Sequence, residues 1–234
     1  MNNPTPDLLV QTPAPYSRLA DYRLIAFDMD STLINIECID EIADAVGRKT
    51  KVAAITEAAM RGEITDFKDS LRRRVALLKG VTVADMERVY TERLRLNPGA
   101  TELVNACKAA GLKVLLVSGG FTFFAHRVRD TLGLDFVRAN TLETVDGRLT
   151  GGLVQQAWGD ICDGAEKRRT VLEVASLLGA DPQRCIAVGD GANDLPMMGA
   201  VGLSVAYHAK PKVREQAMVA INGGGLDRLL DVLH

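Results

Sequence analysis

The stretch Tyr22-Arg-Leu-Ile-Ala-Phe-Asp28-Met-Asp-Ser-Thr-Leu33 decides the fold. Its first half is a short, mostly apolar run, which is typical of a strand buried on both faces of a parallel sheet. An acidic cluster follows this strand without a break. Because ligands of open parallel sheets bind beyond the carboxyl ends of the strands, this arrangement predicts a functional site beside Asp28.

The pattern of an apolar run followed by polar residues recurs three more times. Helical sequence follows the polar residues, and helices are expected at residues 122–132, 166–178 and 193–199. This alternation predicts an α/β fold with a doubly wound parallel sheet. Between residues 136 and 154, apolar stretches flank Asp146-Gly147 and predict a hairpin. The three further runs are Lys113-Val-Leu-Leu-Val-Ser118, Arg184-Cys-Ile-Ala-Val-Gly-Asp190 and Val201-Gly-Leu-Ser-Val205.

Residues 37–96 break this rhythm, because their apolar side chains recur at helical spacing and no strand-like run occurs. We interpret them as a small helical cap of roughly four helices, inserted after the first strand. Residues 22–36 and 97–234 then form the core. Residues 1–21 are polar and rich in proline, and we expect a flexible arm there.

The composition is that of an ordinary globular protein, with 47% hydrophobic and 25% charged residues among 234. The formal net charge of -2 gives no reason to expect a nucleic-acid or membrane partner. No segment reads as a signal peptide or membrane span. The four cysteines form no metal-binding or disulfide pattern, which favours reduced thiols and the cytoplasm. Either a monomer or a homodimer is compatible with this composition.

The predicted strand ends would deliver several carboxylates to one pocket if the strands are neighbours. Like charges that close would repel strongly in a buried site, and a divalent cation removes this repulsion. A donor set made only of oxygen favours Mg²⁺. The glycines beside these residues suit a phosphate group, because exposed backbone N–H groups can bind its oxygens. The residues concerned are Asp28, Asp30, Ser118, Gly119, Lys167, Asp190, Asn193 and Asp194.

A site that binds a metal and a phosphoryl group needs a nucleophile, and Asp28 is the best placed. Attack by its carboxylate on phosphorus would give an aspartyl-phosphate. Asp30 stands two residues later, where it can donate a proton to the leaving oxygen and later take one from water. Lys167 and Ser118 would add hydrogen bonds to the phosphoryl oxygens.

Four motifs resemble those of the haloacid dehalogenase superfamily, in the same order, over about residues 24–230. They are Asp28-Met-Asp-Ser-Thr-Leu33, Ser118 after an apolar strand, Lys167, and Gly-Asp190-Gly-Ala-Asn-Asp194. Within that superfamily, Asn35-Ile-Glu37-Cys-Ile-Asp-Glu-Ile, Phe67-Lys-Asp-Ser-Leu-Arg-Arg-Arg74 and Val117-Ser-Gly-Gly-Phe-Thr are similar to the phosphoserine phosphatases.

The resemblance implies a reaction: hydrolysis of O-phospho-L-serine to L-serine and phosphate, the last step of serine biosynthesis, through an aspartyl-phosphate. The family often carries an additional N-terminal regulatory domain, for which this chain is too short, so we expect no built-in amino-acid sensing. The resemblance also assigns roles: Asp28 and Asp30 in catalysis; Glu37, Phe67, Arg74, Ser118, Gly119, Lys167 and Asn193 in substrate binding; Asp28, the backbone carbonyl of Asp30 and Asp190 on Mg²⁺; and Asp194 in support of the metal's water shell.

The chemistry of phosphoserine agrees with the roles implied for the cap. Arg74 can hold the substrate carboxylate through two parallel hydrogen bonds, and Glu37 can pair with the ammonium. Phe67 lies seven residues before Arg74 and therefore shares its helix face. Because Arg72 and Arg73 stand next to Arg74, the choice among the three depends on the phase of this helix.

Each of these residues also has an ordinary structural interpretation. Glu37 can be part of an acidic first helical turn, residues 72–74 a solvated basic face, and Phe67 a core residue. Three other functions stay open as well. They are transfer of the phosphoryl group to homoserine or another alcohol, hydrolysis of a different small phosphoester, and binding of a phosphoester without catalysis.

Overall fold

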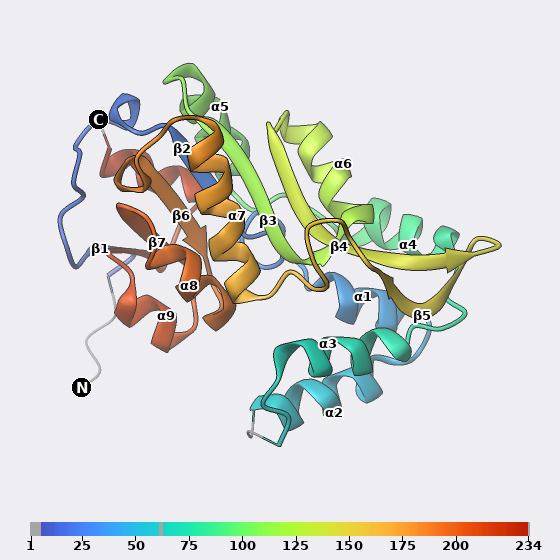
Figure 1. Cartoon of the computed structure of the whole chain (residues 1–234). Helices are drawn as coiled ribbons and strands as arrows, with labels where there is room; N and C mark the ends of the chain where they lie inside the picture. Colours follow the sequence, from blue (N-terminus) through green and yellow to red (C-terminus); the bar gives the residue numbers. More distant parts are fainter. Residues whose placement is uncertain (1–5, 61–62, 234) are drawn as a thin grey trace, which may run out of the picture.

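A sheet of eight strands forms the centre of the part of the chain that the structure describes (Figure 1). The structure is a computed structural model, and it describes residues 6–60 and 63–233. The strand order is β1-β8-β7-β6-β2-β3-β4-β5. The strands are β1 (Leu8–Val10), β2 (Leu24–Phe27), β3 (Lys113–Phe121), β4 (Phe136–Val145), β5 (Arg148–Val154), β6 (Cys185–Gly189), β7 (Leu203–Tyr207) and β8 (Val219–Ile221).

Strand β2 lies between β3 and β6 and pairs with both in parallel. All four of its residues are buried, as its apolar sequence predicts. The chain continues from β2 to β3 and β4 on one side, and only later places β6, β7 and β8 on the other. The order therefore reverses at β2, and the predicted doubly wound α/β fold is confirmed. Asp28 follows β2 at this reversal, where such sheets bind ligands.

Helices cover both faces of the sheet, because side chains along a strand point alternately to opposite faces. Ile25 and Phe27 of β2 pack in one hydrophobic cluster with α5 and α6. Leu24 and Ala26 pack in a second cluster with α7, α8 and α9. The helices on the core are α5 (Ala100–Ala109), α6 (Thr122–Leu132), α7 (Gly164–Leu177), α8 (Leu195–Met198) and α9 (Pro211–Gln216), with short 3-10 turns η1 (Leu19–Asp21), η3 (Pro182–Arg184), η4 (Ala192–Asp194) and η5 (Leu226–Asp231).

The described residues between 38 and 93 form helices and no strand, in line with their helical periodicity. Asp66 begins α3, because its side chain accepts the Lys68 N–H. Thr82 and Asp85 begin α4 with a reciprocal capping box. Figure 1 shows α1, α2 and α3 beyond the end of the sheet towards which β3 points. The helices are α1 (Cys38–Ala45), α2 (Lys49–Met60), α3 (Phe67–Ala76), α4 (Val83–Arg88) and the π-helix η2 (Val89–Arg93).

The hairpin predicted around Asp146-Gly147 is confirmed, and it consists of β4 and β5. Asp146 and Gly147 both have positive φ angles, 48° and 71°, which fits the turn favoured in two-residue hairpins. Gly151 of β5 lies so close to α3 that an added Cβ would be 3.1 Å from the carbonyl oxygen of Ala76. The hairpin therefore extends from the core sheet to contact the cap.

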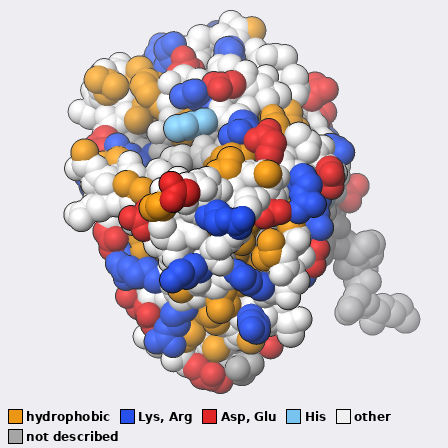
Figure 2. Space-filling model, turned by 90° about the vertical axis from the view of Figure 1, so that its right-hand side faces the viewer, with side chains coloured by type: hydrophobic (Ala, Val, Ile, Leu, Met, Phe, Trp, Pro, Cys, Tyr) orange, Lys and Arg blue, Asp and Glu red, His pale blue; other side chains and the backbone are white. Residues whose placement is uncertain are grey.

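A second contact between cap and core is an ion pair. Figure 2 shows acidic and basic side chains intermixed over one face of the molecule. Arg127 of α6 pairs with Glu87 of α4 at 2.6 Å. The Arg127 guanidinium also lies 3.8 Å from the centre of the Phe123 ring. Among the described residues, no helix has the length and apolar character that crossing a membrane requires.

The prediction of a flexible arm over residues 1–21 was wrong for residues 8–10. These form β1, which pairs antiparallel with β8, and residues 1–5 lie outside the described residues. Leu8 packs against the first hydrophobic cluster and Leu9 against the second. The edge of β8 offers unpaired backbone groups, which explains why so short a segment forms a strand there. Its three residues are too few for a visible alternation in the sequence.

Candidate active site

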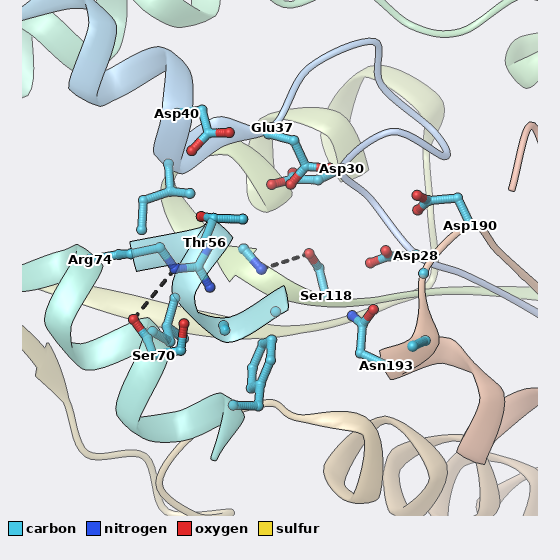
Figure 3. Close-up of a pocket in the computed structure, with 18 of the residues that line it drawn as sticks. Asp28, Asp30, Glu37, Asp40, Thr56, Ser70, Arg74, Ser118, Asp190 and Asn193 are labelled. Atoms are coloured by element: carbon cyan, nitrogen blue, oxygen red, sulfur yellow. Dashed lines mark hydrogen bonds between the residues drawn. The ribbon is translucent and has the colours of Figure 1, made fainter. Parts of the chain in front are cut away.

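A cavity of about 690 Å³ lies between the cap and the core (Figure 3). All of the predicted site residues except Lys167 and Asp194 line it. Those two lie behind Asp28 and have no exposed surface. The structure thus brings the predicted residues together, from β2, β3, α1, α3, α7 and the segment after β6. The lining includes Asp28, Asp30, Glu37, Phe67, Arg74, Ser118, Gly119, Asp190 and Asn193.

Asp28 is held at the carboxyl end of β2 and is paired with a buried lysine. Its backbone N–H donates to the carbonyl of Val188 at 3.0 Å, which continues the pairing of β2 with β6. Nζ of Lys167 lies 2.7 Å from Asp28 Oδ1 and 2.7 Å from Asp194 Oδ1. Burial lowers the pKa of Lys167, but the carboxylates of Asp194 and Asp28 outweigh it and raise the pKa overall. Lys167 therefore stays positively charged beside the nucleophile candidate.

Asp194 anchors the segment after β6. Its Oδ2 accepts the backbone N–H groups of Asp190 at 3.1 Å and Gly191 at 2.9 Å. Its Oδ1 accepts the Lys167 ammonium. Since both oxygens already have partners, the contacts of Asp194 suit a supporting role better than direct metal ligation.

The donor set at the end of β2 and β6 fits a hard divalent cation. Asp28, Asp190 and Asp194 each offer a carboxylate oxygen within 4.8 Å of the others. Burial, followed by the charge of Asp194, raises the pKa of Asp28 and raises that of Asp190 to about 6. Three carboxylates face one lysine, so negative charge is in excess. An all-oxygen set with this excess suits Mg²⁺.

Asp30 is an acid tuned to neutral pH. Its carboxylate accepts the backbone N–H of Cys38 at 3.0 Å and the Cys38 thiol at 3.2 Å. Burial and then the charge of Glu37 raise the pKa of Asp30 to about 7. A group with this pKa can both donate and accept a proton at neutral pH. Glu37 is fixed nearby, since its Oε1 accepts the Ser31 hydroxyl at 2.7 Å.

Residues 118–120, which we call the phosphate loop, lie near the carboxyl end of β3 on the cavity side. The pairing of β3 with β4 shifts register between Val117 and Phe121, so the loop leaves the regular strand. The N–H of Gly120 donates to Ser118 Oγ at 2.9 Å. A Cβ on Gly119 would lie 3.3 Å from Phe67 Cζ. The absence of a side chain at Gly119 lets the Phe67 ring close over this loop.

Arg74 supplies a positive charge from the opposite, cap side of the cavity. Its Nε donates to the carbonyl of Ser70 at 3.4 Å, within α3. Within the described part of the chain, no carboxylate lies within ion-pair distance of its guanidinium. Burial lowers the pKa of Arg74, and the charges of Asp40 and Glu37 oppose this. Figure 3 shows the guanidinium beside Thr56 at the cavity. A held cation without an ion pair suits an anionic group of a ligand.

A model of the haloacid dehalogenase-like hydrolases matches residues 25–199. The chain belongs to the haloacid dehalogenase-like hydrolases. Within this family, it is 71% identical to a phosphoserine phosphatase of Polaromonas sp. strain JS666, over 98% of this chain and 97% of that one. It is 68% identical to a phosphoserine phosphatase of Albidiferax ferrireducens, over 97% and 96%. These relatives confirm the resemblance noted in the sequence.

A solved structure supports the same placement. A phospho-aspartyl intermediate analogue of phosphoserine phosphatase superposes with a TM-score of 0.83 at 38% identity, and covers 91% of this chain and 99% of that one. The haloacid dehalogenase-like fold, with a parallel-dominated sheet and helices on both faces, is therefore confirmed.

Several residues at the site of this hydrolase were not predicted. The cysteines form no recognisable motif in the sequence, yet the Cys38 thiol contacts Asp30. Lys210 lines the cavity as well. Asn140 contacts the phosphate loop. Thr32, by contrast, belongs to the motif after the first strand, and it donates to Asp190 Oδ1 at 3.3 Å. Nothing in the sequence around Asn140 or Lys210 marks either residue.

Proposed function

We propose that this chain hydrolyses O-phospho-L-serine to L-serine and phosphate, with Mg²⁺, through an aspartyl-phosphate on Asp28. The observation that carries the proposal is Arg74, which has no ion pair among the described residues and lies on the cap wall of the cavity that contains Asp28. A substrate that reaches from Asp28 to Arg74 has a phosphate at one end and an anion at the other. The phosphoserine phosphatases at 71% and 68% identity support the same substrate.

In the first step, Asp28 attacks phosphorus. Lys167 holds Oδ1 of Asp28, which leaves Oδ2 for the attack. A bond forms between this oxygen and phosphorus, and the bond from phosphorus to the serine oxygen breaks. Asp30 gives its proton to the leaving oxygen, so that neutral L-serine hydroxyl is released.

In the second step, water hydrolyses the aspartyl-phosphate. Asp30, now a carboxylate, takes a proton from the water as its oxygen bonds to phosphorus. The bond from phosphorus to Asp28 breaks, which releases phosphate and restores the Asp28 carboxylate and the Asp30 acid. Ser118, the Gly119 N–H and Lys167 would bind the phosphoryl oxygens throughout.

Magnesium would be held by Asp28, Asp190 and the backbone carbonyl of Asp30, and it would supply positive charge beside the phosphoryl group. Asn193 and Asp194 would support its bound water. In the cap, Arg74 would hold the substrate carboxylate and Glu37 the ammonium.

Phe67 would exclude water above the phosphate loop while the intermediate forms. We place the reaction in the cytoplasm, because the four cysteines are free thiols and buried.

The proposal is tested by phosphate release from phosphoserine, phosphoethanolamine and an aryl phosphate, each with Mg²⁺ and with a chelator. Arg74→Ala is compared with Arg73→Ala, a matched control whose guanidinium pairs with Asp69 at 2.8 Å on the exposed face of α3. We expect the chelator to stop release. Arg74→Ala should lower kcat/KM for phosphoserine about a hundredfold and leave phosphoethanolamine, which has no carboxylate, nearly unchanged.

Two results would overturn the proposal. In the first, another ester has a higher kcat/KM than phosphoserine, and Arg74→Ala lowers kcat/KM for all substrates equally. Phosphoserine would then not be the substrate. An Asp28→Asn enzyme that keeps full activity would remove the aspartyl-phosphate, since an amide cannot act as this nucleophile.

A further inference from the structure

Asn140 of β4 is a buried amide with no role in the mechanism above. Its side chain is 1% exposed. Nδ2 donates to the carbonyl of Gly119 at 2.8 Å, and Oδ1 accepts the N–H of Cys162 at 2.8 Å. Only one orientation of the amide satisfies both partners, because a carbonyl accepts and an N–H donates. The residue therefore connects the phosphate loop with the segment that precedes α7.

The bond to Gly119 acts on Ser118 through one peptide group. Because a peptide is planar, holding the Gly119 oxygen also sets the direction of the Gly120 N–H. That N–H donates to Ser118 Oγ at 2.9 Å. One lone pair of the Ser118 hydroxyl oxygen thus accepts a hydrogen bond from the backbone. Its hydrogen has no acceptor among the described residues, and Figure 3 shows the hydroxyl beside Asp28 and Asn193 at the cavity.

We propose that Asn140 is a positioning residue that makes the Ser118 hydroxyl a donor to the phosphoryl group. This inference rests on the proposed function and adds a residue to it. The relay runs from the Cys162 N–H to Asn140, from Asn140 to the Gly119 carbonyl, and from the Gly120 N–H to Ser118. A hydroxyl aimed in advance stabilises charge on the phosphoryl oxygens without rearranging during the reaction.

The same amide also links the two sides of the phosphate site. Cys162 directly precedes Asp163, the residue whose side chain caps α7 by accepting the Glu166 N–H. Lys167 lies in the first turns of that helix. Asn140 therefore holds the segment leading to Lys167 against the loop that contains Ser118. Both groups are expected to bind the same phosphoryl oxygens, so their spacing matters to the reaction.

A double-mutant cycle tests the relay, with kcat/KM measured for Asn140→Ala, Ser118→Ala and the pair, on phosphoserine and on an aryl phosphate. We expect Asn140→Ala to lower kcat/KM about tenfold and Ser118→Ala about a hundredfold. In the Ser118→Ala background, Asn140→Ala should lower kcat/KM by clearly less than it does in the parent, because the part of its effect that passes through the hydroxyl is already lost. If the losses in kcat/KM of the two single variants multiply in full in the double variant, the relay is overturned.

Stability is measured in parallel, because a buried amide also contributes to folding. Ser204→Ala is the matched control: this buried serine accepts the Met218 N–H at 3.0 Å in β7 and does not line the cavity. We expect it to lower the free energy of unfolding and leave kcat/KM unchanged. Asn140→Asp keeps the acceptor for Cys162 and loses the donor to Gly119, and it should match Asn140→Ala in kcat/KM. Full activity of Asn140→Asp would contradict the relay.

The two substrates separate failure of this inference from failure of the proposed function. If the parent hydrolyses the aryl phosphate and not phosphoserine, the proposed function fails. The cycle on the aryl phosphate then still decides the relay, because both esters present the same phosphoryl group.

Discussion

Lys167 shows how single residues set the charge of this site. Its ammonium has no exposed surface and bridges Asp28 and Asp194, each at 2.7 Å. A buried charge is tolerated only when partners compensate for its lost hydration. Two carboxylates for one lysine, with Asp190 nearby, leave the site negative. The excess of negative charge therefore suits the binding of a cation.

Cys38 provides a prediction at this scale. Its thiol donates to Asp30 Oδ1 at 3.2 Å, beside the backbone bond to Oδ2. Cys38→Val removes the thiol donor at similar volume and should lower kcat for phosphoserine about three- to tenfold. Cys38→Ser keeps a donor and should retain most of the activity. Steady-state kinetics with Mg²⁺ measure both variants. Equal activity in Cys38→Val and Cys38→Ser would show that Asp30 does not depend on this contact.

The core residues that the sequence could predict, such as Asp28, Ser118 and Asp190, stand at or near the carboxyl ends of parallel strands. Parallel pairing brings such residues together whatever the details of packing. Cys38 and Asn140 do not belong to this group. Their contacts depend on where α1 begins and on the register of β4 against β3, which shifts at the phosphate loop. Neither quantity is visible in a single sequence.

At the scale of elements, α3 carries both residues that we propose to recognise the substrate and to close the cavity. One side of this helix brings Phe67 and Arg74 to the cavity. Lys68 pairs with Asp163 at 3.6 Å, and Arg72 pairs with Asp160, so the helix is also tied to the segment before α7. These ion pairs are partly exposed and individually weak. The hairpin of β4 and β5 supports α3 from another side.

The contact of the hairpin with α3 is tested by two glycines that both have positive φ. Gly147 in the turn has open space around it, whereas a Cβ on Gly151 would meet the Ala76 carbonyl. Gly147→Ala should cost about 1 kcal/mol from backbone strain alone. Gly151→Ala should cost roughly 3 kcal/mol, because crowding against α3 adds to the strain. Urea unfolding of both variants measures the difference. Equal losses would mean that the hairpin does not press on α3.

Gly151→Ala should also affect catalysis, since it displaces the helix that carries Arg74. We expect a higher KM for phosphoserine, with a smaller change for an aryl phosphate that lacks the carboxylate. This pattern distinguishes a displaced helix from general destabilisation, which would lower activity on both substrates alike.

At the scale of the whole molecule, the interior strands of the sheet differ from the strands at its two edges. The interior strands β2, β3 and β6 were predictable, because burial on both faces makes them continuous apolar runs. The edges were not. β1 and β8 have three residues each, and such short segments show no periodicity of their own. The edge formed by β5 faces the cap, whereas the edge formed by β1 is separated from β2 by β8, β7 and β6.

Neighbouring residues of β1 test whether this edge strand contributes to folding. Leu9 packs on the hydrophobic cluster under α7, α8 and α9, whereas Val10 is 46% exposed. Leu9→Asp buries an unpaired carboxylate and should lower the free energy of unfolding by about 2–3 kcal/mol. Val10→Asp should change it by less than about 0.5 kcal/mol. Because three strands separate β1 from Asp28, kcat/KM should stay at the parent value in both. If the two variants have equal free energies of unfolding, β1 does not contribute to folding, and the flexible arm suggested by the sequence is the better description.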